Sequence, residues 1–487
     1  MESARLYILR VLTNLYTKFP LTQKVTMKKY KSSAQTINKI ETTSEIISSR
    51  GGILPVMRYI ENSGFLNLVQ DTLAWTKLNK KGIPVQDTVK QVMAFMIDGT
   101  SSSLSYFNTL KNDPTWATLL ETQSSNIASP QSITRFFKKF TYPQTKHLRK
   151  ILNRLFIARL KREQPKVIIL DIDTMVLNND GAKKRQGVKY SYKKVCGFQP
   201  LQVTWNGMLI DALFRNGSAH SNHGTDVQKI LKNIVTQIRT QYDVNIPIVL
   251  TTDSGFMSQE NFKYYMETLG IFFCCNGKMY DSVKVQGDPI LKESSVEYNH
   301  GNALWAYCEF KSKLDSWSID PLRTVYTKCI CDSSGQYLTE ACTLSSIIYT
   351  NIEENNAALS MGDVESIIAL AHSRGKSELV NRSFKEFMGT ERFPFKRFGM
   401  NAAWYFFQAI GHSLYECFKN DILIPQAIPI TKGSYPNTFR RLFIDCGMKF
   451  VSHSGVLIAK VHESVASRLH LKAIWNMCNS TPPFLLI

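Results

Sequence analysis

Two continuous apolar runs that end in acidic residues constrain the fold of this chain more than any other feature. The first is KVIILDID, at 166–173, and the second is IPIVLTTDSGF, at 246–256. Unbroken apolar runs of this length are typical of buried central strands. Alternation puts Asp171 and Asp173 on one face of the first strand, and Asp253 follows the second. Each aspartate alone could be a turn cap, but functional groups gather at the carboxyl ends of such strands, so the pair favours one shared cation site.

The segments around these runs predict an α/β unit. Two strand-like runs, at 195–205 and 207–215, flank the turn Asn206-Gly207. An amphipathic helix follows, for which Thr225 and the glutamine three residues later predict a capping box. A second helix, at 262–269, precedes a fifth apolar strand, IFFCC. The predicted order is β-β-β-α-β-α-β.

The charge balance indicates a polyanionic partner. The chain has 487 residues, with 59 Lys and Arg against 39 Asp and Glu, which gives a net charge of +20. Hydrophobic residues make up 44%, which is globular composition for two to four domains. An excess of basic charge this large favours nucleic acid over a merely solvated basic surface.

Other sequence features exclude several classes of protein. No apolar run approaches the ~20 residues of a membrane helix. The N-terminal segment is interrupted by Arg5 and Arg10, so it lacks the apolar centre of a signal peptide. The ten cysteines are scattered and include only a lone C-x-C at Cys329 and Cys331, so we expect reduced thiols and not a zinc site. We therefore expect a cytoplasmic protein with no membrane partner and no small-molecule cofactor.

A third carboxylate lies on a helix predicted from about Val364 to Met388. Arg374 precedes Glu378 by one turn and Lys385 follows it by two turns, so all three share a face. A surface ladder of ion pairs is the alternative for these residues taken alone. Together with the two strand ends, however, Glu378 completes a set of three oxygen ligands that suits Mg²⁺ or Mn²⁺. Two such ions can drive cleavage of a phosphodiester, and Arg374 and Lys385 could hold its phosphate.

With these acids, the chain resembles the RNase H-like DDE transposases, and in particular the bacterial insertion-sequence, cut-and-paste group with a β-rich insertion before the glutamate. That group carries Tyr-x2-Arg-x3-Glu-x6-Lys on its last helix. Arg374, Glu378 and Lys385 match this spacing, whereas Ala371 stands at the tyrosine position, where His372 could take over. The segments TSSSLSYFNTLKNDPTWATLLE and SPQSITRFFKKF also fit, and the resemblance spans about residues 50–475.

The resemblance implies an α/β fold with an RNase H-like mixed sheet, a β-rich insertion and a preceding all-helical domain. The expected divisions are 1–45, a flexible basic arm in which Met27 is a second plausible start; 46–163, a helical DNA-binding domain; 164–275, the first part of the catalytic core; 276–355, the insertion; 356–395, the glutamate helix; and 396–487, a helical and basic region.

It also implies that Asp173, Asp253 and Glu378 are the catalytic and metal-binding residues. Thr174 follows Asp173, as a threonine follows the first aspartate in the group, which favours Asp173 over Asp171 as the ligand.

Basic and aromatic residues elsewhere are candidates for DNA contact. The hairpin KKRQGVKYSYKK combines positive charge with aromatic rings, which suits a surface that follows a DNA backbone, although a plain solvated hairpin is equally compatible. Trp305 and Trp317 could stack on a flipped base, but a place in the core is the better expectation for both. The full set of DNA-contact candidates is Arg374, Lys385, Lys183, Lys184, Arg185, Tyr190, His220, Arg135, Lys138 and Arg149.

These observations predict a transposase that binds the terminal inverted repeats of an insertion sequence, cuts the ends and joins them to target DNA by two-metal-ion phosphoryl transfer. We expect double-stranded DNA as partner, a homodimer on DNA, and a location at the bacterial nucleoid. A stand-alone metal-dependent endonuclease of the same fold is the first alternative. A DNA-binding protein with a decayed site is the second.

Overall fold

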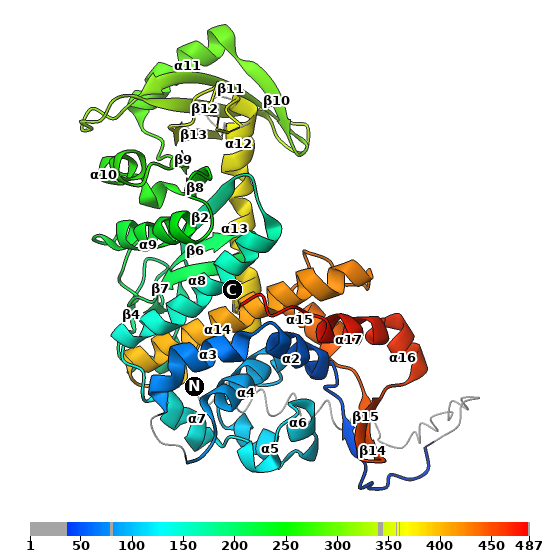
Figure 1. Ribbon diagram of the computed structural model, residues 1–487. Helices are drawn as coiled ribbons and strands as arrows, with labels where there is room; N and C mark the ends of the chain where they lie inside the picture. The colour runs from blue at the N-terminus through cyan, green and yellow to red at the C-terminus, as the bar shows by residue number, and fades with distance from the viewer. Residues whose placement is uncertain (1–36, 78–80, 339–343, 357, 360, 486–487) are drawn as a thin grey trace, which may run out of the picture. The chain divides into compact units, whose positions relative to one another are not determined.

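The computed structural model describes residues 37–77, 81–338, 344–356, 358–359 and 361–485. The chain divides into two compact units, Met1–Glu45 and Ile46–Ile487. In the first unit the described residues, 37–45, contain no helix or strand. The rest of the predicted arm, including Met27, lies outside the described residues. The second unit holds the predicted α/β core and all elements named below (Figure 1).

Nine strands of the described chain form one mixed sheet. Its order is β10-β11-β12-β13-β9-β8-β2-β6-β7. The strands are β2 (Ile168–Thr174), β6 (Leu201–Trp205), β7 (Met208–Leu213), β8 (Ile248–Thr252), β9 (Phe272–Asn276), β10 (Val296–His300), β11 (Ala303–Ser312), β12 (Leu322–Cys331) and β13 (Ser345–Thr350).

The sheet's central part follows the predicted order. Strand β2 runs parallel to β8, and β8 runs parallel to β9, whereas β6 and β7 are antiparallel. Asn206 and Gly207 join β6 to β7 with positive φ angles of 47° and 84°, as a tight hairpin turn requires. These five strands, with an acid at the end of β2 and one just after β8, form the RNase H-like core.

The two faces of the core are covered by different helices. Ile168 and Leu170 of β2 face α9 (Asp226–Gln241) and α10 (Gln259–Lys263), in the main hydrophobic core. The alternate residues share the face of Val249 on β8, which packs under α12 (Val364–Ser373) in a second, smaller core. Figure 1 shows α9 and α10 on one side of these strands and α12 on the other. Asp171 and Asp173 therefore lie on the α12 face.

The insertion continues the core sheet. Strand β13 pairs antiparallel with β9, so the predicted strands of the insertion extend the same sheet. Helix α11 (Asp281–Ser294), which packs on β11, was not expected from the sequence. Residues 339–343 of the insertion lie outside the described residues.

The helical region before the core is all-helical from Ile53, as predicted. Its helices are α2 (Ile53–Asn62), α3 (Phe65–Leu73), α4 (Val85–Asp98), α5 (Tyr106–Asn112), α6 (Pro114–Leu119), α7 (Pro130–Phe137) and α8 (Lys146–Glu163). Helix α8 packs on β7 and α9, so it covers the core sheet. Ser129 caps α7 through its hydroxyl, which accepts a hydrogen bond from the Ser132 amide at 3.2 Å.

Helix α14 (Phe398–Phe418) ties these regions together. Every residue from Met400 to Phe418 is buried, as a helix that is packed on all sides requires. It contacts α4, α8, β7 and α13 (Gly375–Met388). The elements after it are α15 (Pro436–Phe439), β14 (Met448–His453), β15 (Val456–Lys460), α16 (Glu463–Arg468) and α17 (Leu471–Asn479).

Two small sheets complete the described elements. Strand β1 (Ile46–Ser48) pairs with β14, which pairs in turn with β15. Strands β3 (Leu177–Asn178), β5 (Cys196–Phe198) and β4 (Lys189–Tyr190) form the other sheet, and the basic hairpin belongs to it. No helix in the described chain is long and apolar enough to cross a membrane.

Two predicted details differ from the structure. Thr225 precedes α9, but its side chain makes no capping hydrogen bond, because its backbone angles (φ −105°, ψ 20°) are not those of an extended cap residue. The helix predicted from Val364 to Met388 is divided into α12 and α13, and Arg374 stands at the junction.

Candidate active site

A pocket of about 710 Å³ lies where β2 and β8 end beneath α13. Three groups of residues line it: the strand ends, the basic hairpin and one face of α13. They are Asp173, Thr174, Met175, Val176, Tyr192, Lys193, Asp253, Arg374, Glu378, Asn381, Arg382, Lys385 and Glu386. All three predicted catalytic carboxylates are among them.

Asp173 is held in place by hydrogen bonds from two sides. The Thr174 amide donates to its Oδ1 at 2.7 Å, and the Asn381 side-chain amide donates to its Oδ2 at 3.0 Å. Burial raises the pKa of Asp173, while the neighbouring Arg374 guanidinium opposes that rise. A cation beside Asp173 therefore stabilises its ionised form.

Asp253 approaches the same point from β8. The register pairs Asp171 with Thr251, so its continuation puts Asp173 beside Asp253. The amide of Gly255 donates to Asp253 Oδ1 at 2.8 Å and fixes the carboxylate at the start of a short 3₁₀ turn. A Cβ at Gly255 would lie 2.9 Å from that same oxygen and from Ser221 Oγ, so a larger residue here would displace the Asp253 carboxylate or Ser221.

Asp171 has a different environment from Asp173. Its Oδ1 accepts a hydrogen bond from the Thr251 hydroxyl at 2.9 Å. It lines a separate, neighbouring cavity, together with Thr251 and Val167. The geometry therefore places Asp173, and not Asp171, on the pocket that contains Asp253 and Glu378.

Arg374 joins the strand acids to one another. Its Nη2 lies 3.5 Å from Asp173 Oδ1 and 3.3 Å from Asp253 Oδ2. Its Nε lies 3.5 Å from Asp171 Oδ1. One guanidinium thus neutralises carboxylates from both strands, and the two pocket aspartates face a common point.

Glu378 is one turn further along α13 and is exposed. In the part of the chain that the structure describes, no three Asp, Glu, His or Cys side chains lie close enough together to hold one metal ion. The convergence of Glu378 with the two aspartates therefore stays a prediction. The donor set itself fits a hard divalent cation, because all three ligands are carboxylates and two of them already hold a positive charge between them.

Lys385 is engaged within the protein. Its Nζ donates to the Val176 carbonyl at 2.9 Å and lies 2.8 Å from a Glu391 carboxylate oxygen. It still lines the pocket, so it ties α13 to the segment that follows β2. Sequence spacing alone could not reveal these partners, which come from two other segments.

The basic hairpin meets the pocket through residues beside the main candidates. Tyr192 and Lys193 line the pocket, whereas Tyr190 is exposed elsewhere on the hairpin. Lys184 is exposed, and Lys183 lies 3.7 Å from Asp180. Burial and the nearby Arg392 lower the pKa of Arg185.

Two residues of the pocket, Asn381 and Arg382, were not among the candidates from sequence, and Tyr192 was included only as part of the aromatic hairpin. For Tyr192 a signal existed, because its two-residue spacing from Tyr190 is that of one strand face. Arg382 follows Glu378 by four residues, which is the spacing of neighbours on one helix face. Asn381 carried no comparable signal.

The other candidates for DNA contact fall into two groups. Arg135, Lys138 and His220 are exposed. Arg149 instead forms a two-pronged salt bridge with Asp211, at 2.7 and 2.6 Å, and Asp211 is fully buried on β7. We therefore correct the expectation for Arg149: its guanidinium compensates a buried charge, so it is a structural residue.

The two tryptophans of the insertion are not equivalent. Trp317 is buried and packs edge-on against Phe262 at 5.5 Å, which confirms the core alternative for this residue. Trp305 is partly exposed on β11, and its ring lies 6.2 Å from that of His372 on α12. Neither lines the pocket that contains Asp173.

The mixed sheet, with acidic residues at two adjacent strand ends and a helix carrying a third beside them, has the strand order of an RNase H-like core. The family model described as "Transposase DDE domain group 1" matches residues 32–466, so the chain belongs to this family of DDE transposases.

Among solved structures, the chain is similar to the piggyBac transposase in a synaptic complex with hairpin DNA. The identity is 12%, the match covers 82% of each chain, and the TM-score is 0.39. No curated protein matches the chain. The assignment to the family therefore rests on the match over residues 32–466.

Proposed function

We propose that this transposase binds the terminal inverted repeats of a bacterial insertion sequence, cuts DNA at these ends and joins them to target DNA. The observation that carries the proposal is the pocket in which Asp173 and Asp253 both pair with the Arg374 guanidinium. Glu378 lines the same pocket. Carboxylates in this arrangement serve phosphodiester chemistry, and the net charge of +20 suits a DNA substrate.

Asp173, Asp253 and Glu378 would hold Mg²⁺ or Mn²⁺. When bound, such ions activate the attacking oxygen and stabilise the leaving oxygen. The protein's own groups prepare the pocket: Asn381 and the Thr174 amide orient Asp173, and the Gly255 amide orients Asp253. Lys193 and Arg382 line the same pocket and offer positive charge to a phosphate.

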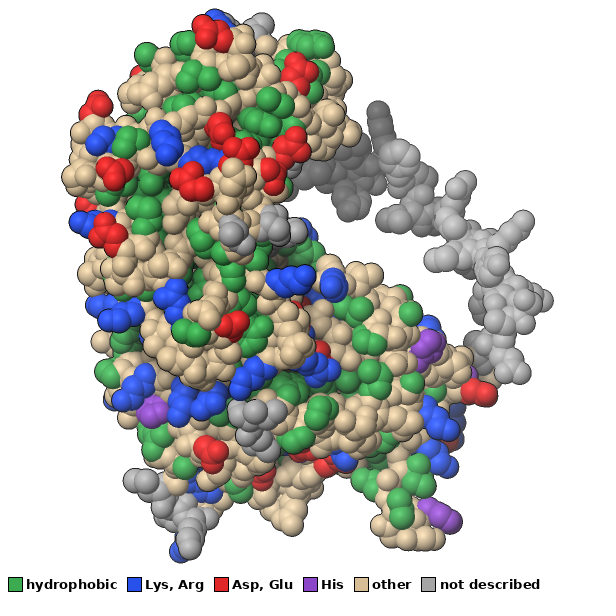
Figure 2. Space-filling view, turned by 45° about the horizontal axis from the view of Figure 1, so that its top comes forward, with side chains coloured by type: hydrophobic (Ala, Val, Ile, Leu, Met, Phe, Trp, Pro, Cys, Tyr) green, Lys and Arg blue, Asp and Glu red, His purple; other side chains and the backbone are tan. Residues whose placement is uncertain are grey.

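The distribution of charge supports a DNA path away from the insertion. Residues 276–365 contain 13 Asp and Glu but only seven Lys and Arg, so the excess of basic charge lies in the rest of the chain. Figure 2 shows acidic side chains gathered at the top of that view, with lysines and arginines below them. An acidic insertion repels a DNA backbone, which argues against stacking of bases on Trp305.

The exposed basic residues of α7 and the hairpin are the proposed DNA contacts beyond the pocket. Arg135 on α7 and Lys138 directly after it are exposed, and the buried face of α7 packs Phe137 on Trp404 of α14 at 5.2 Å. Lys183, Lys184 and Tyr190 extend the surface from the hairpin. We propose that α7 contacts the ends and that the hairpin follows the backbone.

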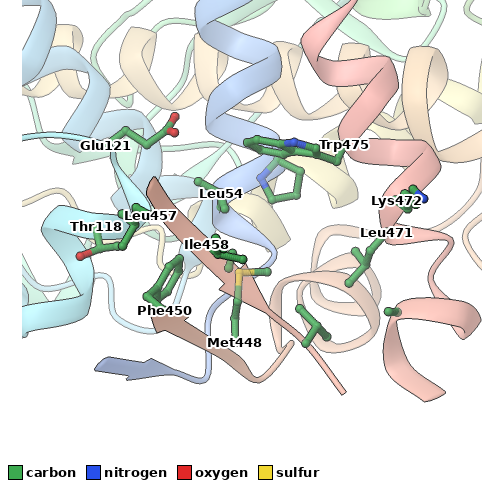
Figure 3. Close-up of a pocket in the computed structure, with 14 residues that line it drawn as sticks. Leu54, Thr118, Glu121, Met448, Phe450, Leu457, Ile458, Leu471, Lys472 and Trp475 are labelled. Carbon is green, nitrogen blue, oxygen red and sulfur yellow. The ribbon is translucent and has the colours of Figure 1, made fainter. Parts of the chain in front are cut away.

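We further propose that two copies assemble on DNA through β15. The side chains of β15 are exposed, including Val456, Leu457 and Ile458, and β15 is an edge strand of its sheet. Beside it lies an apolar groove of about 440 Å³, lined by Leu54, Phe450 and Trp475 among others (Figure 3). Edge pairing of two β15 strands about a two-fold axis would cover both features.

Arg440 does not belong to this surface. It is buried, and its Nη2 donates to the carbonyls of Met96 and Phe387, at the ends of α4 and α13. Arg441 is exposed and lies 3.2 Å from Asp445.

Light scattering with and without duplex DNA tests the dimer, and a strictly monomeric complex at saturating protein would contradict it.

A strand-transfer assay tests the main proposal. The substrate is DNA from the flanks of the gene, incubated with target plasmid and Mg²⁺. Joined products that disappear in Asp253→Asn are expected. Hydrolysis without joining would favour the stand-alone endonuclease, and binding without either reaction would favour the decayed protein.

A further inference from the structure

Arg374 occupies the position between the two strand acids of the pocket. It lies within 3.5 Å of Asp173 and 3.3 Å of Asp253, and a further ion pair links it to Asp171. Its side chain is 16% exposed, so these pairs form in a partly desolvated setting. Ion pairs of this kind are screened less by solvent than those on an open surface.

A divalent cation and this guanidinium need the same oxygen atoms. Metal binding requires ionised carboxylates with lone pairs free to face the ion. Here Asp173 Oδ1 and Asp253 Oδ2 both face Arg374 Nη2. A positive group at this point also repels an approaching cation, so the two occupants exclude each other.

Arg374 lies at a break in the helical segment. It is the junction residue between α12 and α13. Gly375 follows it, and a Cβ added there would contact no other described segment within 4 Å. A DNA phosphate is the competing partner that suits arginine best, since it accepts two parallel hydrogen bonds from the guanidinium.

We propose that Arg374 is a charge gate, which keeps divalent metal out of the DNA-free protein and opens when a DNA phosphate takes its guanidinium. The inference rests on the proposed function and adds an order to it: DNA binds first, and metal loading follows. Because binding free energies are linked, DNA must raise the affinity for metal by the same factor as metal raises the affinity for DNA. The gate would keep the carboxylates free of metal until DNA is bound.

The test is a Mn²⁺ titration of the full-length protein, followed by electron paramagnetic resonance and calorimetry. Wild-type protein is measured alone and with a duplex of about 30 base pairs, which supplies phosphates without needing the true ends. The DNA should tighten Mn²⁺ binding by about 10-fold or more. Arg374→Ala should tighten it by about 10-fold or more without DNA, because the competing charge is gone.

Arg382→Ala is the matched control. It removes one arginine from the same pocket, but its guanidinium stacks on Tyr435 at 4.8 Å instead of bridging the aspartates. It should change DNA-free Mn²⁺ affinity by less than about threefold, since only a more distant charge is lost. Arg374→Gln and thermal unfolding of each variant show whether the fold is intact. The wild-type comparison with and without DNA needs no variant at all.

The possible results distinguish failure of the charge gate from failure of the proposed function. Equal Mn²⁺ affinity with and without DNA, together with an unchanged affinity in Arg374→Ala, overturns the gate but leaves strand transfer possible. Absence of Mn²⁺ binding in every protein overturns both the gate and the metal-dependent mechanism. Tighter binding in Arg374→Ala without any strand transfer by wild type supports the gate and refutes the proposed function.

Discussion

The two sides of the pocket differ in how firmly they hold their carboxylates. On the strand side, Asp173 and Asp253 sit at the ends of paired strands and accept backbone hydrogen bonds. On the helix side, Glu378 is exposed and follows a helix junction. The sheet therefore fixes two of the three proposed ligands, whereas the third depends on the position of α13. If the proposed function is right, a change on the helix side, and not in the sheet, completes the site.

Under the proposed function both sides are required for chemistry, and this gives the largest expected effect. Asp173→Asn and Glu378→Gln should each lower the rate of strand transfer by at least ~10³-fold, since each removes a charge needed in the transition state. DNA affinity should change little. Glu378→Gln should leave the unfolding free energy within about 0.5 kcal/mol, because the side chain is exposed. Retention of a tenth of the activity by either variant would remove that residue from the site.

Helix α8 packs on β7 and so supports the sheet that carries the strand side. Arg149→Ala should destabilise the protein by about 3–5 kcal/mol, because it leaves the buried Asp211 of β7 without its cation. Lys150→Ala, on the exposed face of the same helix, should stay within about 0.5 kcal/mol. Denaturant unfolding measures both. Similar small losses for the two variants would show that Arg149 is not structural.

The helix side has a pH-sensitive anchor. Ser383 of α13 is hydrogen-bonded to the buried His412 of α14 at 2.9 Å. Burial, with Lys419 and Arg440 nearby, lowers the pKa of His412 to about 3, although Glu416 lies 3.9 Å away. The histidine stays neutral in the folded protein, whereas in the unfolded chain it takes up a proton below its ordinary pKa of about 6.5. Its contribution to the free energy of unfolding is therefore full above pH 6.5 and is lost as the pH falls towards 3.

Between these two pH values, the free energy of unfolding should fall by up to about 1.4 kcal/mol per pH unit because of this histidine. Unfolding free energies between pH 7 and 4 measure it. His412→Gln should flatten the curve relative to wild type, whereas His453→Gln, at an exposed position, should not. A wild-type curve that His412→Gln does not change would contradict the assignment.

Substitution of Lys385 should give the smallest effect. It tests whether this lysine binds DNA or keeps its partners within the protein. Lys385→Ala should weaken DNA binding by no more than about 10-fold and reduce the slope of log affinity against log salt by about one, if the lysine exchanges Glu391 for a phosphate. Fluorescence anisotropy at several salt concentrations measures this. An unchanged slope would show that Lys385 keeps its bonds to Val176 and Glu391.

The sequence predicted the strand side better than the helix side for a physical reason. Apolar runs and two-residue alternation are local signals, and they were enough to place Asp171 and Asp173 on one face. The preference for Asp173 came instead from the family resemblance, through the threonine that follows it. The hairpin turn at Asn206-Gly207 was also local, because its φ angles depend on those two residues. These predictions needed no knowledge of distant partners.

The remaining features depend on partners far away in the chain. Helical spacing put Arg374, Glu378 and Lys385 on one face, but it could not show that Arg374 pairs with the strand acids or that Lys385 binds Val176. In the same way, the charge pattern of α8 concealed Arg149, whose partner Asp211 lies 62 residues further on. Long-range compensation of buried charge leaves no periodic signal in a sequence.

The most direct test of the central claim is a structure of the full-length protein on end DNA with Mn²⁺, in which anomalous scattering locates the metal. The account predicts Mn²⁺ bound by Asp173, Asp253 and Glu378, with Arg374 moved from the aspartates to a phosphate. Metal bound at another site, or Glu378 more than ~10 Å from both aspartates in that complex, would contradict it.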